Sequence, residues 1–171
     1  GNPFVTTKIT KEALKIYSNQ ILNIYKEQII QFSEEFSIST DFVQIPKELT
    51  KKIEEYKKIL PKDYKHYKRV NFDEPFRIFL SLVFHRLDNF QKNKKGYKYF
   101  HEFLDDILLF QNSVLKIFGT KIQNTNLDSF IEMVYQFEFH GVSLDIRQNS
   151  SVINAQKGRE YFDFEELIKE I

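Results

Sequence analysis

The sequence predicts a single, mainly helical domain over residues 1–171, with one short strand near residues 142–147. Apolar residues recur three or four positions apart through most of the chain, which is typical of helices that bury one face. Residues 142–147 (VSLDIR) instead alternate apolar and polar side chains, as a half-buried strand does. A length of 171 residues suits one domain with a real hydrophobic core.

Two helices are predicted before residue 61. The first covers residues 10–36, where one apolar stripe contains Leu14, Tyr17, Ile21, Tyr25, Ile29, Phe32 and Phe36. At 1.5 Å per residue this helix would be about 40 Å long, which exceeds what a compact domain of this size usually contains. Pro46 suits the first turn of a second helix, and Pro61 is expected to end it. Residues 62–72 show no clear period, so we expect a loop there.

A third helix is predicted to begin at residues 73–75 (DEP). Asp73 is the expected N-cap, Glu74 gives an acidic first turn, and a proline costs little at that position. The apolar face of this helix continues to Phe90, and a Lys/Asn/Gly turn follows at residues 92–96. A fourth helix is predicted to end before Gly119, because glycine readily adopts the backbone conformation that terminates a helix.

The last part of the chain raises a question about the strand. Asn126 is expected to cap a short helix that ends at Phe137, and residues 163–171 begin with a capping-box pattern that predicts a last helix. Between them the strand at 142–147 has no second strand to pair with. A buried backbone group without a hydrogen-bond partner costs about 1–3 kcal/mol. We therefore expect the partner strands to lie outside this chain.

Composition and charge exclude several classes of function. The chain has no cysteine, so disulfides, thiolate nucleophiles and thiolate zinc sites are excluded. It shows no long uncharged apolar run and no signal sequence, which predicts a soluble, cytoplasmic protein without membrane contact. A net charge of +1 implies no general attraction to nucleic acid. The 18 phenylalanines suggest more apolar surface than one small domain can cover.

Arg147 is the residue with the clearest potential for ligand binding. It ends the predicted strand on the same face as Ser143 and Asp145. A guanidinium in that position could bind a phosphate or carboxylate through two parallel hydrogen bonds. A structural salt bridge between Arg147 and Asp145 explains the same pattern, and the pattern alone leaves both interpretations open.

Other polar patterns predict no site. His101 and Asp105 stand four residues apart on one helix face, but a metal site needs further ligands that the sequence does not offer. No catalytic residue is predicted. The basic and aromatic stretches 64–69 (YKHYKR) and 94–99 (KKGYKY) could contact phosphates and stack bases. Because the overall charge is balanced, we expect solvated loops there and no nucleic-acid binding.

Four stretches resemble one enzyme family. GNPFVT and KITKEAL at the start, DEPFRIFLSLVFHRL in the middle and FHGVSLDIRQNS near the end occur in this order. Together they resemble bacterial and plant phosphoenolpyruvate carboxylase, over residues 1 to about 150. The DIRQ-x-S stretch is the most specific of them, and single matches such as EP-F-R are weak.

The resemblance implies a fold and an activity. Enzymes of this family are several times longer and contain an eight-stranded α/β barrel surrounded by helices. They act as homotetramers and use Mg²⁺ or Mn²⁺ to convert phosphoenolpyruvate and bicarbonate to oxaloacetate and phosphate. This chain would be a helical bundle segment from the N-terminal half, excised from the longer enzyme and ending in one barrel strand. Arg147 matches the DIRQ arginine, which in the family contacts the phosphate of phosphoenolpyruvate.

The chain also departs from the family pattern. Phe84 stands where the family usually has an arginine, Glu138 replaces a glycine, and Ile153 replaces a histidine. The family's catalytic histidines, metal carboxylates and mobile glycine-rich loop have no counterpart here, so we expect the chain alone to be inactive. The remainder of the carboxylase is then its expected partner. The alternative is a stand-alone, non-catalytic helical interaction module derived from that family, whose exposed phenylalanines bind a partner.

Overall fold

The computed structural model describes residues 7–119 and 125–142, and this part of the chain folds into six α-helices and no strand. The helices are α1 (Thr7–Glu35), α2 (Lys47–Ile59), α3 (Pro61–Val70), α4 (Pro75–Gln91), α5 (Phe100–Phe118) and α6 (Thr125–Phe137). The prediction of a mainly helical chain is therefore confirmed. Of the strand predicted at 142–147, only residue 142 is described, and the helix predicted at 163–171 lies outside the described residues.

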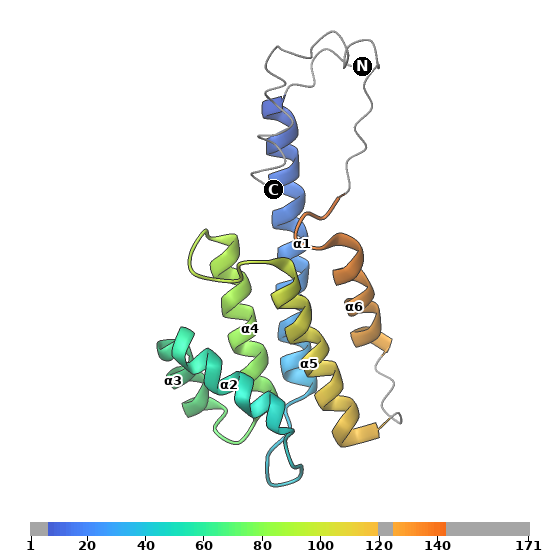
Figure 1. Cartoon of the computed structure of the whole chain (residues 1–171). Helices are drawn as coiled ribbons and strands as arrows, with labels where there is room; N and C mark the ends of the chain where they lie inside the picture. Colours follow the sequence, from blue (N-terminus) through green and yellow to red (C-terminus); the bar gives the residue numbers. More distant parts are fainter. Residues whose placement is uncertain (1–6, 120–124, 143–171) are drawn as a thin grey trace.

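Four long helices form the centre of the molecule (Figure 1). The longest helix, α1, lies along α4 and also contacts α6, while α5 contacts both α4 and α6. The colours of Figure 1 show that α1 and α5 run in one direction and α4 and α6 in the other. Helices α2 and α3 pack across α4 on one side of this bundle, and α2 also contacts α5.

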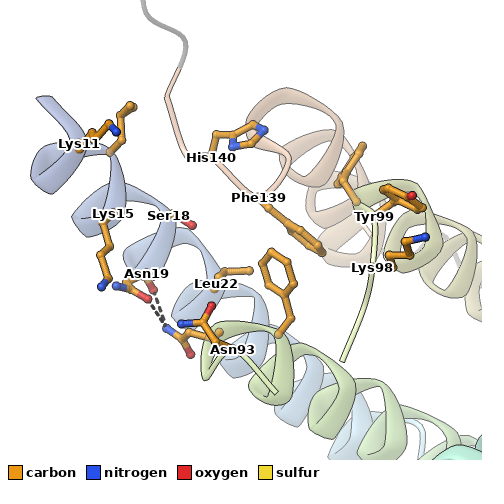
Figure 2. A pocket seen from close by; sticks show the side chains of 14 residues that line it. Lys11, Lys15, Ser18, Asn19, Leu22, Asn93, Lys98, Tyr99, Phe139 and His140 are labelled. Carbon is orange, nitrogen blue, oxygen red and sulfur yellow. Dashed lines mark hydrogen bonds between the residues drawn. The ribbon is translucent and has the colours of Figure 1, made fainter. Parts of the chain in front are cut away.

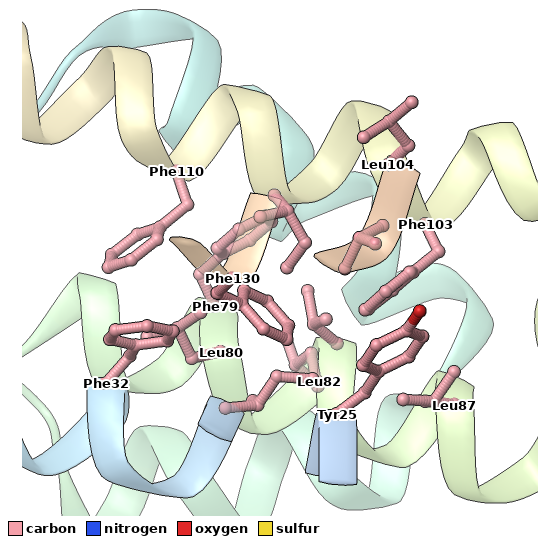
Figure 3. Packing of buried hydrophobic residues seen from close by; sticks show 14 of the residues in the cluster. Tyr25, Phe32, Phe79, Leu80, Leu82, Leu87, Phe103, Leu104, Phe110 and Phe130 are labelled. Carbon is pink, nitrogen blue, oxygen red and sulfur yellow. The ribbon is translucent and has the colours of Figure 1, made fainter. Parts of the chain in front are cut away.

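Aromatic side chains fill the space between the long helices (Figure 3). The ring of Tyr25 on α1 lies 5.6 Å from the ring of Phe103 on α5 and 5.6 Å from that of Phe130 on α6. Phe32, one further turn along α1 and beyond, lies 5.5 Å from Phe130 and 6.3 Å from Phe110. Ring pairs at these distances add to the stability that burial of their large apolar area already gives.

The many phenylalanines thus belong mostly to the core, which corrects one expectation. Eight of them are buried: Phe32, Phe36, Phe76, Phe79, Phe103, Phe110, Phe130 and Phe139. Only Phe42 and Phe72 are prominently exposed, at 84% and 68%. The predicted exposed phenylalanine surface is therefore small, and several of the exposed large side chains are isoleucines of α1 instead.

Residues 62–72 do not form the predicted loop, because α3 occupies most of them. Pro61 ends α2 as expected but also occupies the first turn of α3, where its missing N–H costs nothing. The backbone N–H of Tyr64 donates to the carbonyl of Leu60, so α3 follows α2 almost directly. Tyr64 and Tyr67 then lie three residues apart and pack partly buried against the core. Short helices with only two such anchors leave a weak periodic signal.

Helix boundaries agree with the sequence except at two caps. Glu74, rather than Asp73, precedes the first residue of α4, and its carboxylate accepts a hydrogen bond from Ser37 Oγ at 2.9 Å. Helix α6 begins at Thr125, so Asn126 lies inside its first turn instead of capping it. Gly119 follows α5 with a φ of +66°, as predicted for the residue that terminates this helix.

Candidate functional site

An open cavity of about 480 Å³ lies beside the first half of α1 (Figure 2). Its other walls are the end of α4, the start of α5 and the turn after α6, and rings of these elements (Phe90, Phe100 and Phe139) form its apolar part. Three lysines also line it: Lys11, Lys15 and Lys98. Among the described lining residues there is no carboxylate, so the cavity has a positive potential that favours small anions over cations.

Polar side chains fix α1 against α4 at the edge of this cavity. The amide Nε2 of Gln91 donates to Asn19 Oδ1 at 3.2 Å, a contact drawn in Figure 2, and to Asn23 Oδ1 at 3.0 Å. Lys26 Nζ donates to Gln91 Oε1 at 2.6 Å and to Asp88 Oδ1 at 3.2 Å. These contacts join successive turns of α1 to the end of α4, and they set the shape of the cavity wall.

The turn after α6 is held firmly against α1 and α5. The hydroxyl of Tyr25 donates to the carbonyl oxygen of Glu138 at 2.8 Å, and Phe139 is buried with its ring 4.6 Å from that of Phe90. Gly141 has a φ of +76°, and a Cβ atom there would lie 2.8 Å from the carbonyl oxygen of Tyr17. The chain therefore leaves this turn from a fixed position on α1, a few residues before Arg147 in the sequence.

Replacing Gly141 with alanine is expected to destabilise the chain by about 1–3 kcal/mol, because the left-handed backbone and the close carbonyl both oppose a Cβ atom. Gly119→Ala is the matched control, since Gly119 also has a positive φ but has nothing within 4 Å of its Cβ position. Urea unfolding of both variants should show the larger loss for Gly141→Ala. An equal loss would mean that the approach to Tyr17 contributes nothing.

A second polar site is buried where α2, α4 and α5 meet. We call Tyr56, Arg86, Tyr97 and Asp106 the buried polar cluster. The hydroxyls of both tyrosines donate to Asp106 Oδ2, that of Tyr97 at 2.5 Å. Arg86 Nη1 donates to Tyr56 Oη at 2.8 Å, and Arg86 Nη2 donates to Glu102 Oε2 at 2.8 Å. Four segments of the chain are thereby joined through one carboxylate and one guanidinium.

The charges of this cluster are only partly compensated. Asp106 is fully buried, and burial raises the pKa of its carboxyl to about 6, although both tyrosines, Lys52 and Arg86 act to lower it. Burial also raises the pKa of both tyrosines well above the usual value, so they stay protonated as donors. Asp106 Oδ1 and Arg86 Nε have no hydrogen-bond partner, and Lys52 Nζ lies 3.7 Å from Asp106 Oδ1. The cluster ties the helices together, but it includes no nucleophile activated by a base.

The sequence analysis missed this cluster, although a signal for it exists. Asp106 stands three residues after Phe103 and four before Phe110, both of which are buried. A carboxylate on the buried stripe of a helix requires hydrogen-bond donors from neighbouring elements. That rule predicts that donors exist, but not which residues provide them.

The predicted site residue Arg147 lies outside the described residues, as do Ser143 and Asp145. The described histidines form no metal centre: within residues 7–119 and 125–142, no three His, Asp or Glu side chains are grouped so that they could hold an ion. The Mg²⁺ or Mn²⁺ implied by the resemblance therefore does not fit this part of the chain. His85 instead shares a hydrogen bond with the hydroxyl of Tyr67 at 3.0 Å.

The two basic and aromatic stretches are not the solvated loops that the sequence suggested. Residues 64–69 lie in α3. In the stretch 94–99, Tyr97 is buried in the polar cluster and only Tyr99 remains half exposed. Their aromatic rings are thus partly committed to internal packing. No helix in the described part of the chain is long and apolar enough to cross a membrane.

Comparisons with known proteins agree on one family. The family model for phosphoenolpyruvate carboxylase matches residues 1–156. The phosphoenolpyruvate carboxylase of Thermosynechococcus vestitus is 26% identical over 170 residues, which cover 88% of this chain and 16% of the relative. That of Xanthomonas euvesicatoria is 29% identical over 153 residues, covering 89% and 17%. That of a Nostoc species is 28% identical over 165 residues, covering 88% and 16%.

The match is therefore long in this chain and short in its relatives. It includes all six described helices and the stretch around Arg147, whereas the chain spans about a sixth of the length of these curated relatives. Since the family model covers far more than half of the residues, the chain belongs to the phosphoenolpyruvate carboxylase family.

Proposed function

We propose that this chain works as a segment of a phosphoenolpyruvate carboxylase, which converts phosphoenolpyruvate and bicarbonate to oxaloacetate and phosphate. Its chemical contribution would be Arg147, whose guanidinium would bind the phosphate of phosphoenolpyruvate. The observation that carries this proposal is the family match, which continues through the FHGVSLDIRQNS stretch to residue 156.

The chemistry of the reaction fits an arginine in this role. Bicarbonate attacks the phosphate group, so negative charge builds on the phosphate oxygens as the reaction proceeds. A guanidinium held in place stabilises this charge most strongly where it develops, through short charge-assisted hydrogen bonds. Arginine also stays protonated at any working pH, so its contribution does not depend on a proton equilibrium.

The geometry of the described residues supports the same role. Tyr25, Phe139 and Gly141 hold the turn after α6 against α1 and α5. An arginine that must meet a phosphate gains from a rigid scaffold, since a shift of about 1 Å can cost a large factor in rate. The helical bundle would thus serve to fix the point from which the substrate-binding stretch begins.

We further propose that the isolated chain is inactive. The described residues bring together no metal ligands and no nucleophile with a base, and they match none of the family's catalytic histidines. The metal ion, Mg²⁺ or Mn²⁺, and the remaining catalytic groups would come from other parts of the carboxylase. By the same resemblance the complete enzyme would be a cytoplasmic homotetramer that binds neither nucleic acid nor membrane.

The first test is the mass and activity of the native polypeptide that carries this segment. We expect an intact mass several times the 20.6 kDa of this chain and turnover in an assay that couples oxaloacetate to NADH oxidation. The purified 171-residue chain should show no turnover in the same assay, with or without Mg²⁺. Turnover by the isolated chain would contradict its proposed inactivity.

A native polypeptide of only 20.6 kDa would favour the alternative, a non-catalytic interaction module. The exposed isoleucines of α1 give that alternative its one specific support, because such a surface suits a protein partner. Binding of a partner without carboxylase activity would then be the expected behaviour.

A further inference from the structure

Helix α1 is packed along only part of its length. Its buried side chains begin at Ile21 and continue to Phe32, whereas no described residue from 8 to 20 is buried. Figure 1 shows the first half of α1 extending well past the ends of α4 and α5. Isolated helices of about 12–15 residues are marginal in water, so most of their stability in proteins comes from packing. This overhanging half receives little packing from the described bundle.

Large apolar side chains point outward from this half. Ile16 is 57% exposed, Tyr17 is 46% exposed, and Ile24, at the first packed turns, is 41% exposed. With about 100° of rotation per residue, these three side chains lie within one arc of about 100°. We call Ile16, Tyr17 and Ile24 the outer patch of α1. It faces away from the buried stripe that contains Tyr25 and Phe32.

The same face of α1 changes from apolar to polar further along the helix. Beyond Ile24 it carries Glu27, Gln31 and Glu34, all of them exposed. Glu34 follows Ile16 by 18 residues, which is five full helical turns, so both side chains point in the same direction. A helix face that only had to meet water would carry polar residues throughout. The apolar part is instead confined to the overhanging half.

We propose that the outer patch of α1 docks against a part of the carboxylase polypeptide that lies outside these 171 residues. This inference rests on the proposed function, in which the chain works within a longer enzyme. The alignments support that occupant, because they cover 88% or more of this chain but only 16–17% of each relative quoted above. The occupant is expected to present an apolar surface, since the patch contains no charged group.

Cysteine labelling can test the patch, because the chain has no cysteine of its own. The variant Ile16→Cys is treated with a maleimide, both as the 171-residue chain and within the native full-length carboxylase, and peptide mass spectrometry follows the labelled position. We expect labelling of Ile16→Cys to be about tenfold slower or more in the full-length enzyme, because it then requires local opening. The matched control Glu34→Cys should label at similar rates in both forms.

Several outcomes would overturn the proposal. Equal labelling of Ile16→Cys in both forms would show that nothing covers the patch in the enzyme. Protection in the 171-residue chain that grows with concentration would assign the patch to a second copy of the chain. Concentration-independent protection there would assign it to another part of this chain. Equal protection of Ile16→Cys and Glu34→Cys would overturn the restriction to the overhanging half.

The test is separable from that of the proposed function. Loss of protection at Ile16→Cys in an enzyme that still turns over phosphoenolpyruvate would refute the docking surface alone. A protected Ile16→Cys in a long polypeptide without carboxylase activity would refute the proposed function and leave the docking surface in place.

Discussion

Replacing Arg147 with alanine in the full-length carboxylase should lower kcat for phosphoenolpyruvate about 10²–10³-fold while the helical segment stays folded. The expected size follows from the loss of one fixed donor to a group on which charge develops in the transition state. If the guanidinium contacts the phosphate only in the ground state as strongly as in the transition state, KM would rise instead and kcat would not change. Steady-state kinetics against phosphoenolpyruvate separate these two cases.

Two further variants make this experiment specific. Arg147→Lys keeps the charge but loses the planar pair of donors, so it should recover only part of the lost rate. Arg77→Ala removes a partly exposed arginine whose Nη1 lies 3.2 Å from Glu74 Oε2, and it should leave the kinetics unchanged. Unchanged kinetics for Arg147→Ala would contradict the assignment. A loss of helical circular dichroism in that variant would make its kinetics a consequence of unfolding.

The sequence predicted the long helices well because each carries a sustained apolar stripe. The stripe of α1 from Ile21 to Phe36 is buried as predicted, and the helix is indeed longer than its neighbours. Tyr17 belongs to the same predicted stripe but is 46% exposed. Periodicity identifies the face of a helix, but it cannot state how far along that face the packing partners extend.

Short elements and tertiary contacts were beyond the reach of such patterns. Helix α3 has only two partly buried tyrosines, which do not repeat often enough to give a period. The buried polar cluster brings Tyr56 and Asp106 together although they are 50 residues apart in the sequence. Arg147 could be singled out only by resemblance, because its pattern with Asp145 suits a salt bridge as well as a phosphate site.

The buried polar cluster gives the second large effect. Replacing Arg86 with methionine should destabilise the 171-residue chain by about 3–5 kcal/mol near pH 8, because the carboxylate of Asp106 then remains buried without its guanidinium. Methionine keeps most of the side-chain volume, so the loss would reflect charge rather than a cavity. The free energy of unfolding, measured in urea, reports it. Lys57→Met is the control, since Lys57 pairs with Glu54 at 3.0 Å on the exposed surface of α2.

The pH dependence distinguishes a charge effect from a packing effect. The pKa of Asp106 is raised to about 6, against about 3.9 in an unfolded chain, so between these values the folded state binds more protons. Where the folded state binds more protons, stability falls as pH rises, and this group therefore destabilises the chain increasingly from about pH 4 to pH 6. Arg86 is one of the groups that lower this pKa, so the pKa in Arg86→Met should be higher still.

The difference in stability between Arg86→Met and the unaltered chain should consequently be largest at about pH 8 and shrink as Asp106 becomes protonated in acid. A protonated Asp106 needs no counter-charge and can still accept hydrogen bonds from Tyr56 and Tyr97. A difference that stays constant between pH 8 and pH 5 would contradict this interpretation. It would mean that Arg86 stabilises the bundle through its packing between the rings of Tyr56 and Tyr97, 4.9 Å and 4.0 Å from its guanidinium carbon, rather than through its charge.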